Sequence, residues 1–207
     1  MRKFLIFLFL AFVSLYGFGA YASQPFGLNV GMTPIKNLIK NPNTTGAVNG
    51  SPGTLPTNWT LSGNAGLTVT VVGTGVANGI PWIDIRFNGT TNATGFSLRF
   101  QGSGGNIVTN VNPLTMTLYA AYSAGALTNI TSAKIGYDVF NSSSGYITSD
   151  TSAALTLTSD LTKFKYVHTT ETNAYRINPY FIVATPNGAA VDVTFRLAIP
   201  SVVTGSY

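Results

Sequence analysis

Short segments of alternating apolar and polar residues follow one another from about residue 54 to the C-terminus. The clearest is GIPWIDIRF at 79–87. Successive side chains of a strand point to opposite faces of its sheet, so such alternation predicts a strand with one buried face and one solvent-facing side. The alternation places Ile83, Ile85 and Phe87 on one face and Trp82, Asp84 and Arg86 on the other.

The same reading predicts about ten short strands. Turn signals rich in Gly, Asn, Ser or Pro recur every eight to fifteen residues, and no segment has a convincing 3.6-residue period. This pattern is typical of an all-β antiparallel sandwich. We expect four strands within 54–100 and others at 114–122, 133–140, 154–157, 163–168, 174–184 and 190–199, with an edge strand near 35–39.

Alternation also predicts which side chains enter the core. The segments 116–122 and 176–183 are apolar on both faces, so we expect them to be central strands or to cover an aromatic-lined groove. Elsewhere the predicted core residues are Phe96, Leu98 and Phe100, then Ile135, Tyr137 and Val139, and finally Val191, Val193, Phe195, Leu197 and Ile199.

The N-terminus has the three parts of a secretory signal. Basic residues at 2 and 3 precede an apolar run over 4–13, and Ala20 and Ala22 have the A-x-A spacing of a cleavage site. We expect a hydrophobic signal helix at 1–22, removed after Ala22, then an irregular segment at 23–52 and the sandwich at 53–207. The alternative is an uncleaved membrane anchor, because the apolar segment approaches the roughly twenty residues that span a bilayer.

Composition narrows the function classes. Charged residues are only 8% of the chain, which suits an extracellular or virion-borne β protein. Without Arg2 and Lys3 of the leader, nine basic and six acidic residues remain, a net charge of +3. These charges are scattered singly, so we expect no nucleic-acid partner. With no cysteine, disulfides and thiolate metal sites are excluded.

Two segments carry a family likeness. NLIKNPNTTG at 37–46, followed by LPTNW, resembles the opening of jelly-roll carbohydrate-binding modules attached to bacterial cellulases and xylanases. The run from 50 to 90 and the ending GAAVDVTFRLAIPSVVTGS look like modules of phage tail fibres, tailspikes and other structural proteins. The resemblance implies a galactose-binding-like jelly roll and a glycan ligand.

The chain departs from the resembled modules at a structural calcium site. Thr45 stands where those modules usually have a Glu, and the LAIPSV segment has no acidic residue. Ca²⁺ needs several oxygen ligands. We therefore expect no cofactor, with a structural calcium ion, as in the resembled modules, as the alternative.

The outward row on 82–86 is the best candidate for binding. A Trp ring stacks on sugar C–H groups while Asp and Arg bond hydroxyls, so Trp82, Asp84 and Arg86 suit a glycan. The alternative is a stabilising ladder in which Asp84 and Arg86 pair with Arg196 and Asp192 on a neighbouring strand. Side chains that would extend the same surface are Tyr119, Arg176, Asn178, Tyr180 and Arg196. Trp59 is predicted to plug the core or an edge.

Enzyme chemistry has little support. His168 is the only histidine and lies in YVHTTET, with no nucleophile-elbow pattern nearby. A glycosidase needs two carboxylates beside the bond, and Asp84 with Asp192 is the one pair to consider. GTGVANG at 73–79 joins two strands, so it predicts a hairpin rather than a phosphate loop.

Two functional hypotheses follow. The first is a secreted or cell-surface, non-catalytic module that binds a polysaccharide or surface glycan. The second is a phage virion or cell-surface structural or adhesion protein that forms a homo-oligomer or larger assembly with little glycan binding. A groove with exposed aromatics favours the first, and an apolar interface favours the second.

Overall fold

A computed structural model of the chain describes residues 36–102, 107–108, 113–169, 171 and 173–206. The predicted signal segment and the proposed cleavage site lie outside these residues. Among the residues described, no helix is long and apolar enough to cross a membrane.

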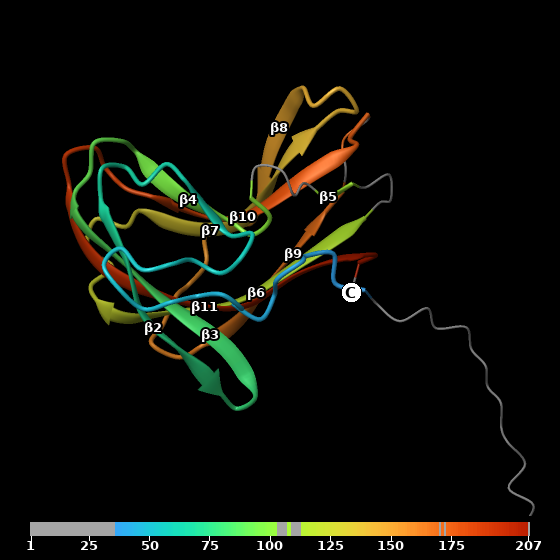
Figure 1. Cartoon of the computed structure of the whole chain (residues 1–207). Helices are drawn as coiled ribbons and strands as arrows, with labels where there is room; N and C mark the ends of the chain where they lie inside the picture. Colours follow the sequence, from blue (N-terminus) through green and yellow to red (C-terminus); the bar gives the residue numbers. More distant parts are fainter. Residues whose placement is uncertain (1–35, 103–106, 109–112, 170, 172, 207) are drawn as a thin grey trace, which may run out of the picture. The chain divides into compact units, whose positions relative to one another are not determined.

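Two antiparallel sheets pack face to face and form a jelly-roll sandwich, as predicted (Figure 1). Most connections cross from one sheet to the other, so strands close in sequence alternate between layers. The first sheet has the strand order β1-β4-β10-β7-β8, with the short β5 also pairing with β10. Its strands are β1 (Thr60–Ser62), β4 (Gly95–Arg99), β5 (Ile107–Val108), β7 (Ser132–Phe140), β8 (Tyr146–Thr151) and β10 (Arg176–Ala184).

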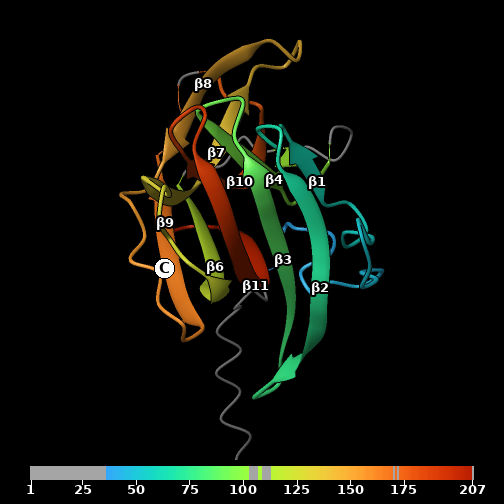
Figure 2. The same ribbon diagram turned by 90° about the vertical axis from the view of Figure 1, so that its left-hand side faces the viewer.

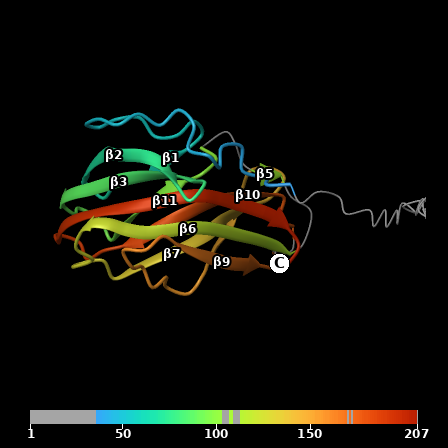
Figure 3. The same ribbon diagram turned by 90° about the horizontal axis from the view of Figure 1, so that it is seen from below.

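The second sheet has five strands in the order β2-β3-β11-β6-β9. Figure 2 shows these five strands side by side, and Figure 3 shows the same order from below. Asn78 and Gly79 have positive φ angles of 52° and 77°, which suits the two-residue hairpin between β2 and β3. Its strands are β2 (Thr68–Ala77), β3 (Ile80–Thr90), β6 (Leu114–Gly125), β9 (Thr162–His168) and β11 (Ala190–Thr204).

The core lies between the two inner faces. Rings from both sheets meet there, with Phe87 stacked on Phe96 at a centroid distance of 4.2 Å and Phe181 edge-on to Phe195 at 5.3 Å. All of the predicted core residues except Ile199 are buried. Trp59 is buried in the core, as predicted, and its Nε1 donates to the Asn41 carbonyl at 3.0 Å.

Alternation fails at Ile199 because β11 contains a bulge there. The register with β6 shifts between Ala198 and Ser201, and Ile199 has a φ of 40°. A bulge moves the side chains that follow it onto the other face. Val202 is therefore fully buried, while Ile199 is only half-buried.

Two predicted strands are absent from the described residues. The chain at 36–39 is irregular, although Leu38 N donates to Val202 O at 2.8 Å along the end of β11. Residues 154–157 are also irregular, and the strand that precedes them is β8. The segments 116–122 and 176–183 lie inside their sheets, as predicted, within β6 and β10.

Candidate functional site

The outward row on β3 lies on the outer face of the five-stranded sheet. Trp82, Asp84 and Arg86 point away from the core, opposite Ala198, Arg196 and Thr194 of β11. Tyr119 of β6 pairs with Ala198 on the same face. We call the five residues that interact on β3 and β11 the Trp82 ladder: Trp82, Asp84, Arg86, Asp192 and Arg196.

The charged groups of the Trp82 ladder satisfy one another. Arg196 forms a bidentate salt bridge with Asp84, in which Nε and Nη2 each donate a hydrogen bond of 2.8 Å. Arg86 forms the same bidentate salt bridge with Asp192, at the same distances. These hydrogen bonds raise the pKa of Arg196 and of Arg86 and lower the pKa of Asp192. The ladder alternative of the sequence analysis is confirmed, and the carboxylates of Asp84 and Asp192 are engaged by arginines.

The Trp82 ring is also engaged. The Arg196 guanidinium lies 3.9 Å from the ring centroid, a cation–π contact. Ring atoms lie 2.7 Å from where a Cβ on Gly75 would stand and 3.3 Å from that of Gly73. Packing against the two glycines of β2 and the guanidinium leaves this ring only partly exposed.

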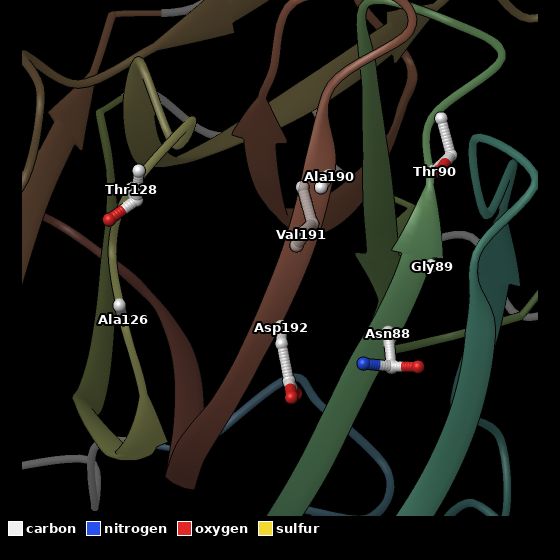
Figure 4. A pocket seen from close by; sticks show the side chains of 8 residues that line it. All are labelled: Asn88, Gly89, Thr90, Ala126, Thr128, Ala190, Val191 and Asp192. Carbon is white, nitrogen blue, oxygen red and sulfur yellow. The ribbon is translucent and has the colours of Figure 1, made fainter.

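A hollow lies beside the Trp82 ladder. It has a volume of about 450 Å³ and is drawn in Figure 4. Its one charged group is the carboxylate of Asp192, which Arg86 already holds. Its other polar side chains are those of Asn88, Thr90 and Thr128. Its lining residues are Asn88, Gly89, Thr90, Ala126, Thr128, Ala190, Val191 and Asp192.

Arg176, Asn178 and Tyr180 lie on the outer face of the other sheet. They belong to β10, the central strand of the six-stranded sheet, whereas Trp82 and Tyr119 belong to the five-stranded sheet. The expectation that they extend one surface is wrong. The alternation of β10 correctly separates them from the core but does not identify the sheet to which the strand belongs.

These three side chains lie in a compact group on β4, β10, β7 and β8. Strand register places Asn178 beside Asp138, which in turn lies beside Ser149. Tyr146 and Arg176 occupy the next row, on either side of Phe140, and Arg99 lies beside Tyr180. We call this group the Asn178 cluster: Arg99, Asp138, Tyr146, Ser149, Arg176, Asn178 and Tyr180.

Hydrogen bonds join half of the Asn178 cluster into a chain. Arg99 Nη2 donates to Asp138 Oδ2 at 2.7 Å, and Ser149 Oγ donates to Asp138 Oδ1 at 2.7 Å. The Tyr146 hydroxyl is 2.9 Å from Ser149 Oγ. The Arg99 side chain thus crosses over β10 to reach β7, and it lies above the strand next to Asn178.

Three atoms of the cluster are unsatisfied. Within the described residues, Arg99 Nε, Arg176 Nε and Asn178 Oδ1 are buried side-chain atoms with no hydrogen-bond partner. Asn178 is only 2% exposed although it points to the outer side of its sheet. Because buried polar groups are almost always paired, two donors and an acceptor without partners on one small surface point to a ligand.

Aromatic rings border these polar atoms. Tyr146 is 61% exposed and packs edge-on to Phe140 at 6.0 Å, and Arg176 lies over the Phe140 ring at 6.0 Å. Tyr180 is 3% exposed, and burial, reinforced by the nearby Asp138 carboxylate, raises its pKa to about 12. The cluster therefore combines an exposed ring with directed hydrogen-bonding groups.

His168 faces the interior rather than a surface. It is fully buried and its Nδ1 pairs with Asp150, while Tyr137 packs against it at a centroid distance of 5.3 Å. Burial opposes ionisation of Asp150, but hydrogen bonds from Tyr166 and His168 lower the pKa of this carboxyl overall. The group joins the edges of the two sheets, β8 to β9.

Four members of the Asn178 cluster are not among the predicted site residues: Arg99, Asp138, Tyr146 and Ser149. Tyr146 and Ser149 lie on β8, a strand that the sequence analysis does not predict. The turn residues NSSSG, followed by the strand-forming residues Tyr146, Ile147 and Thr148, would have indicated it. Within the described ranges, no group of three or more His, Asp and Glu residues could hold a metal ion.

No protein-family model and no curated protein sequence matches the chain. Solved structures that resemble it include the enzymatically active domain of tailspike protein 4 from bacteriophage CBA120. That domain aligns with 72% of this chain at a TM-score of 0.49 and 15% identity, and the alignment spans 20% of the tailspike chain.

Two carbohydrate-binding modules are similar over most of their own length. The CBM22-1 xylan-binding domain of Paenibacillus barcinonensis Xyn10C aligns with 72% of this chain and 87% of its own, with a TM-score of 0.47 and 16% identity. A family 16 carbohydrate-binding module aligns with 81% and 99%, with a TM-score of 0.42 and 15% identity. A likeness this distant carries no information about the ligand of the present chain.

Proposed function

We propose that the chain is an exported, non-catalytic module that binds a glycan through the Asn178 cluster. The observation that carries the proposal is the set of buried atoms without partners: Arg99 Nε, Arg176 Nε and Asn178 Oδ1. They flank an exposed tyrosine on one sheet face.

A sugar suits this combination of groups. The three atoms have almost no exposed surface, so binding requires the arginine side chains to shift. Each sugar hydroxyl both donates and accepts, so neighbouring hydroxyls then satisfy the two arginine donors and the Asn178 acceptor together. The exposed ring of Tyr146 offers an apolar face for sugar C–H groups, while the polar atoms orient the ring of the sugar. Asp138 is held by Arg99 and Ser149, so it fixes the donors in place.

The Trp82 ladder supports the same function less well. Its carboxylates and guanidinium groups bond one another, and Arg196 already stacks on the ring of Trp82. A glycan bound there has to displace existing contacts, which costs much of the free energy that new contacts supply. The ladder therefore serves as the matched control for the Asn178 cluster.

The test is a glycan array and titration calorimetry with the purified exported chain, beside Tyr146→Ala and Trp82→Ala. We expect binding that Tyr146→Ala abolishes and Trp82→Ala preserves, with both variants folded by circular dichroism. Binding lost only in Trp82→Ala assigns the site to the Trp82 ladder instead. No glycan signal together with a defined oligomer favours the self-associating structural protein.

Mass spectrometry of the same exported sample tests the leader. An N-terminus at Ser23 supports removal of the signal after Ala22. A retained N-terminus in a membrane fraction supports the anchor alternative.

A further inference from the structure

Arg176 differs from the other three arginines of the described residues. Arg86, Arg99 and Arg196 each grip an aspartate. The side chain of Arg176 makes no hydrogen bond or ion pair within that part of the chain, and its guanidinium lies 6.0 Å from the centroid of the Phe140 ring. Its Nε is buried and unpaired. A half-buried guanidinium without an anion is costly to the fold unless a ligand completes it.

The Asn178 cluster as a whole has a net charge of one positive unit. Asp138 is its only carboxylate, and Arg99 engages it through Nη2 alone, which leaves Arg99 Nε free. A guanidinium that presents Nε and a neighbouring Nη forms a fork that matches the two oxygens of a carboxylate. Arg99 is thus committed at one end, whereas Arg176 has no carboxylate partner among the described residues. Its Nε is buried, so the complete fork forms when the side chain shifts on binding.

Asn178 lies between the two guanidinium groups. It is two residues from Arg176 on the same face of β10 and beside the path of Arg99. Its buried, unpaired Oδ1 is an acceptor and suits a hydroxyl, not a carboxylate. The ligand that fits therefore carries an anionic group a short distance from a hydroxyl, beside an apolar ring face for Tyr146.

We propose that the Asn178 cluster selects acidic glycans, in which the carboxylate of a uronic acid binds the Arg176 fork and an adjacent hydroxyl donates to Asn178 Oδ1. The inference rests on the proposed glycan-binding function and adds the class of sugar. A neutral sugar leaves the charge of Arg176 uncompensated, so discrimination comes from that side chain.

The experiment compares polygalacturonate, alginate and hyaluronate, each beside its carboxyl-reduced counterpart, in which the acid becomes a primary alcohol. Binding to the exported chain is measured by calorimetry at fixed ionic strength. We expect at least one acidic polymer to bind about tenfold or more tightly than its reduced form, the equivalent of one charge-assisted contact. Arg176→Gln should remove this preference while retaining a circular dichroism spectrum of the folded chain.

Non-specific attraction is controlled by Lys163→Gln, which removes the same charge from the outer face of the five-stranded sheet. This variant should bind as the parent chain does. An equal loss in Lys163→Gln and Arg176→Gln overturns the proposal, as does equal binding of the acidic and reduced polymers. If neutral glycans bind equally well and Tyr146→Ala abolishes this binding, the proposed glycan-binding function is supported and only the proposed preference for acidic glycans is refuted. If no glycan binds at all, both proposals fail.

Discussion

The two outer faces of the sandwich carry similar side chains but differ in how the polar atoms of these side chains are paired. Each has arginines, aspartates and at least one aromatic ring, supported by neighbouring antiparallel strands. On the five-stranded sheet every charge of the Trp82 ladder is paired, with Arg86 and Asp192 about half-exposed at 46% and 51%. On the six-stranded sheet Asp138 is 11% exposed, as Asp84 is on the ladder, but three neighbouring polar atoms have no partner within the described residues. Residue types alone therefore do not distinguish a stabilising ladder from a binding surface; the pairing of their atoms does.

The largest difference between the faces should appear when one aspartate is removed from each. Asp138→Ala leaves Arg99 and Ser149 without their shared acceptor in a largely buried setting, which should cost about 3 kcal/mol of unfolding free energy. Asp192→Ala on the exposed pair should cost little, because solvent replaces the lost partner. Urea denaturation measures both. Equal costs would contradict the expectation that solvent replaces the partner of the exposed Arg86.

Replacing Trp82 should reduce stability more than binding. Trp82→Ala removes a half-buried ring that packs on Gly73 and Gly75 and a cation–π contact with Arg196, and we expect a loss of about 2 kcal/mol. Affinity for a glycan should change less than about twofold, since the ring lies on the sheet opposite the Asn178 cluster. A large loss of affinity in a folded variant contradicts this division of roles.

Gly75→Ala tests how closely that ring is packed. An added Cβ would lie 2.7 Å from Cζ2 of Trp82, so the indole has to shift away from β2. The expected cost is about 1 kcal/mol. Tryptophan fluorescence in a Trp59→Phe background should report a more exposed indole, and an unchanged spectrum would indicate that Trp82 is already free to move. Gly63→Ala is no suitable control, because Gly63 has a φ of 74° that strains alanine.

Much of the fold can be predicted from the sequence because burial imposes a period of two. Residues 83–87 and 191–197 alternate cleanly, and their core assignments are confirmed. The pattern fails at Ile199 because a bulge changes the period without changing the residue types. It also misses β8, an edge strand of polar and aromatic residues whose burial is too slight to leave an alternating signal.

The candidate site is harder to predict because alternation identifies a face but not a sheet. Tyr119 and Tyr180 both alternate outward, yet β6 and β10 belong to different layers. Because many connections cross between the two sheets, strands that are consecutive in sequence lie in different sheets. Residues about 40 positions apart, such as Arg99 and Asp138, then come together within one sheet. The pairing of Asp84 with Arg196 was among the sequence-based alternatives because both lie on strongly patterned strands. The free Nε of Arg176 depends on side-chain geometry, which no pattern encodes.

The smallest effect concerns the titration of Tyr180 on the six-stranded sheet. Its pKa is raised from about 10 to about 12 because burial disfavours the phenolate and Asp138 repels it. The neutral hydroxyl is therefore favoured by the fold, and its contribution to stability is complete below pH 10 and is lost as the pH rises through 12. Absorbance titration at 295 nm should show that Tyr180→Phe removes a tyrosine that ionises near pH 12. A bound glycan should raise the pKa of Tyr180 further only if the ligand covers the Asn178 cluster. A ligand on the Trp82 ladder should leave this pKa unchanged. The same titration therefore distinguishes the two faces.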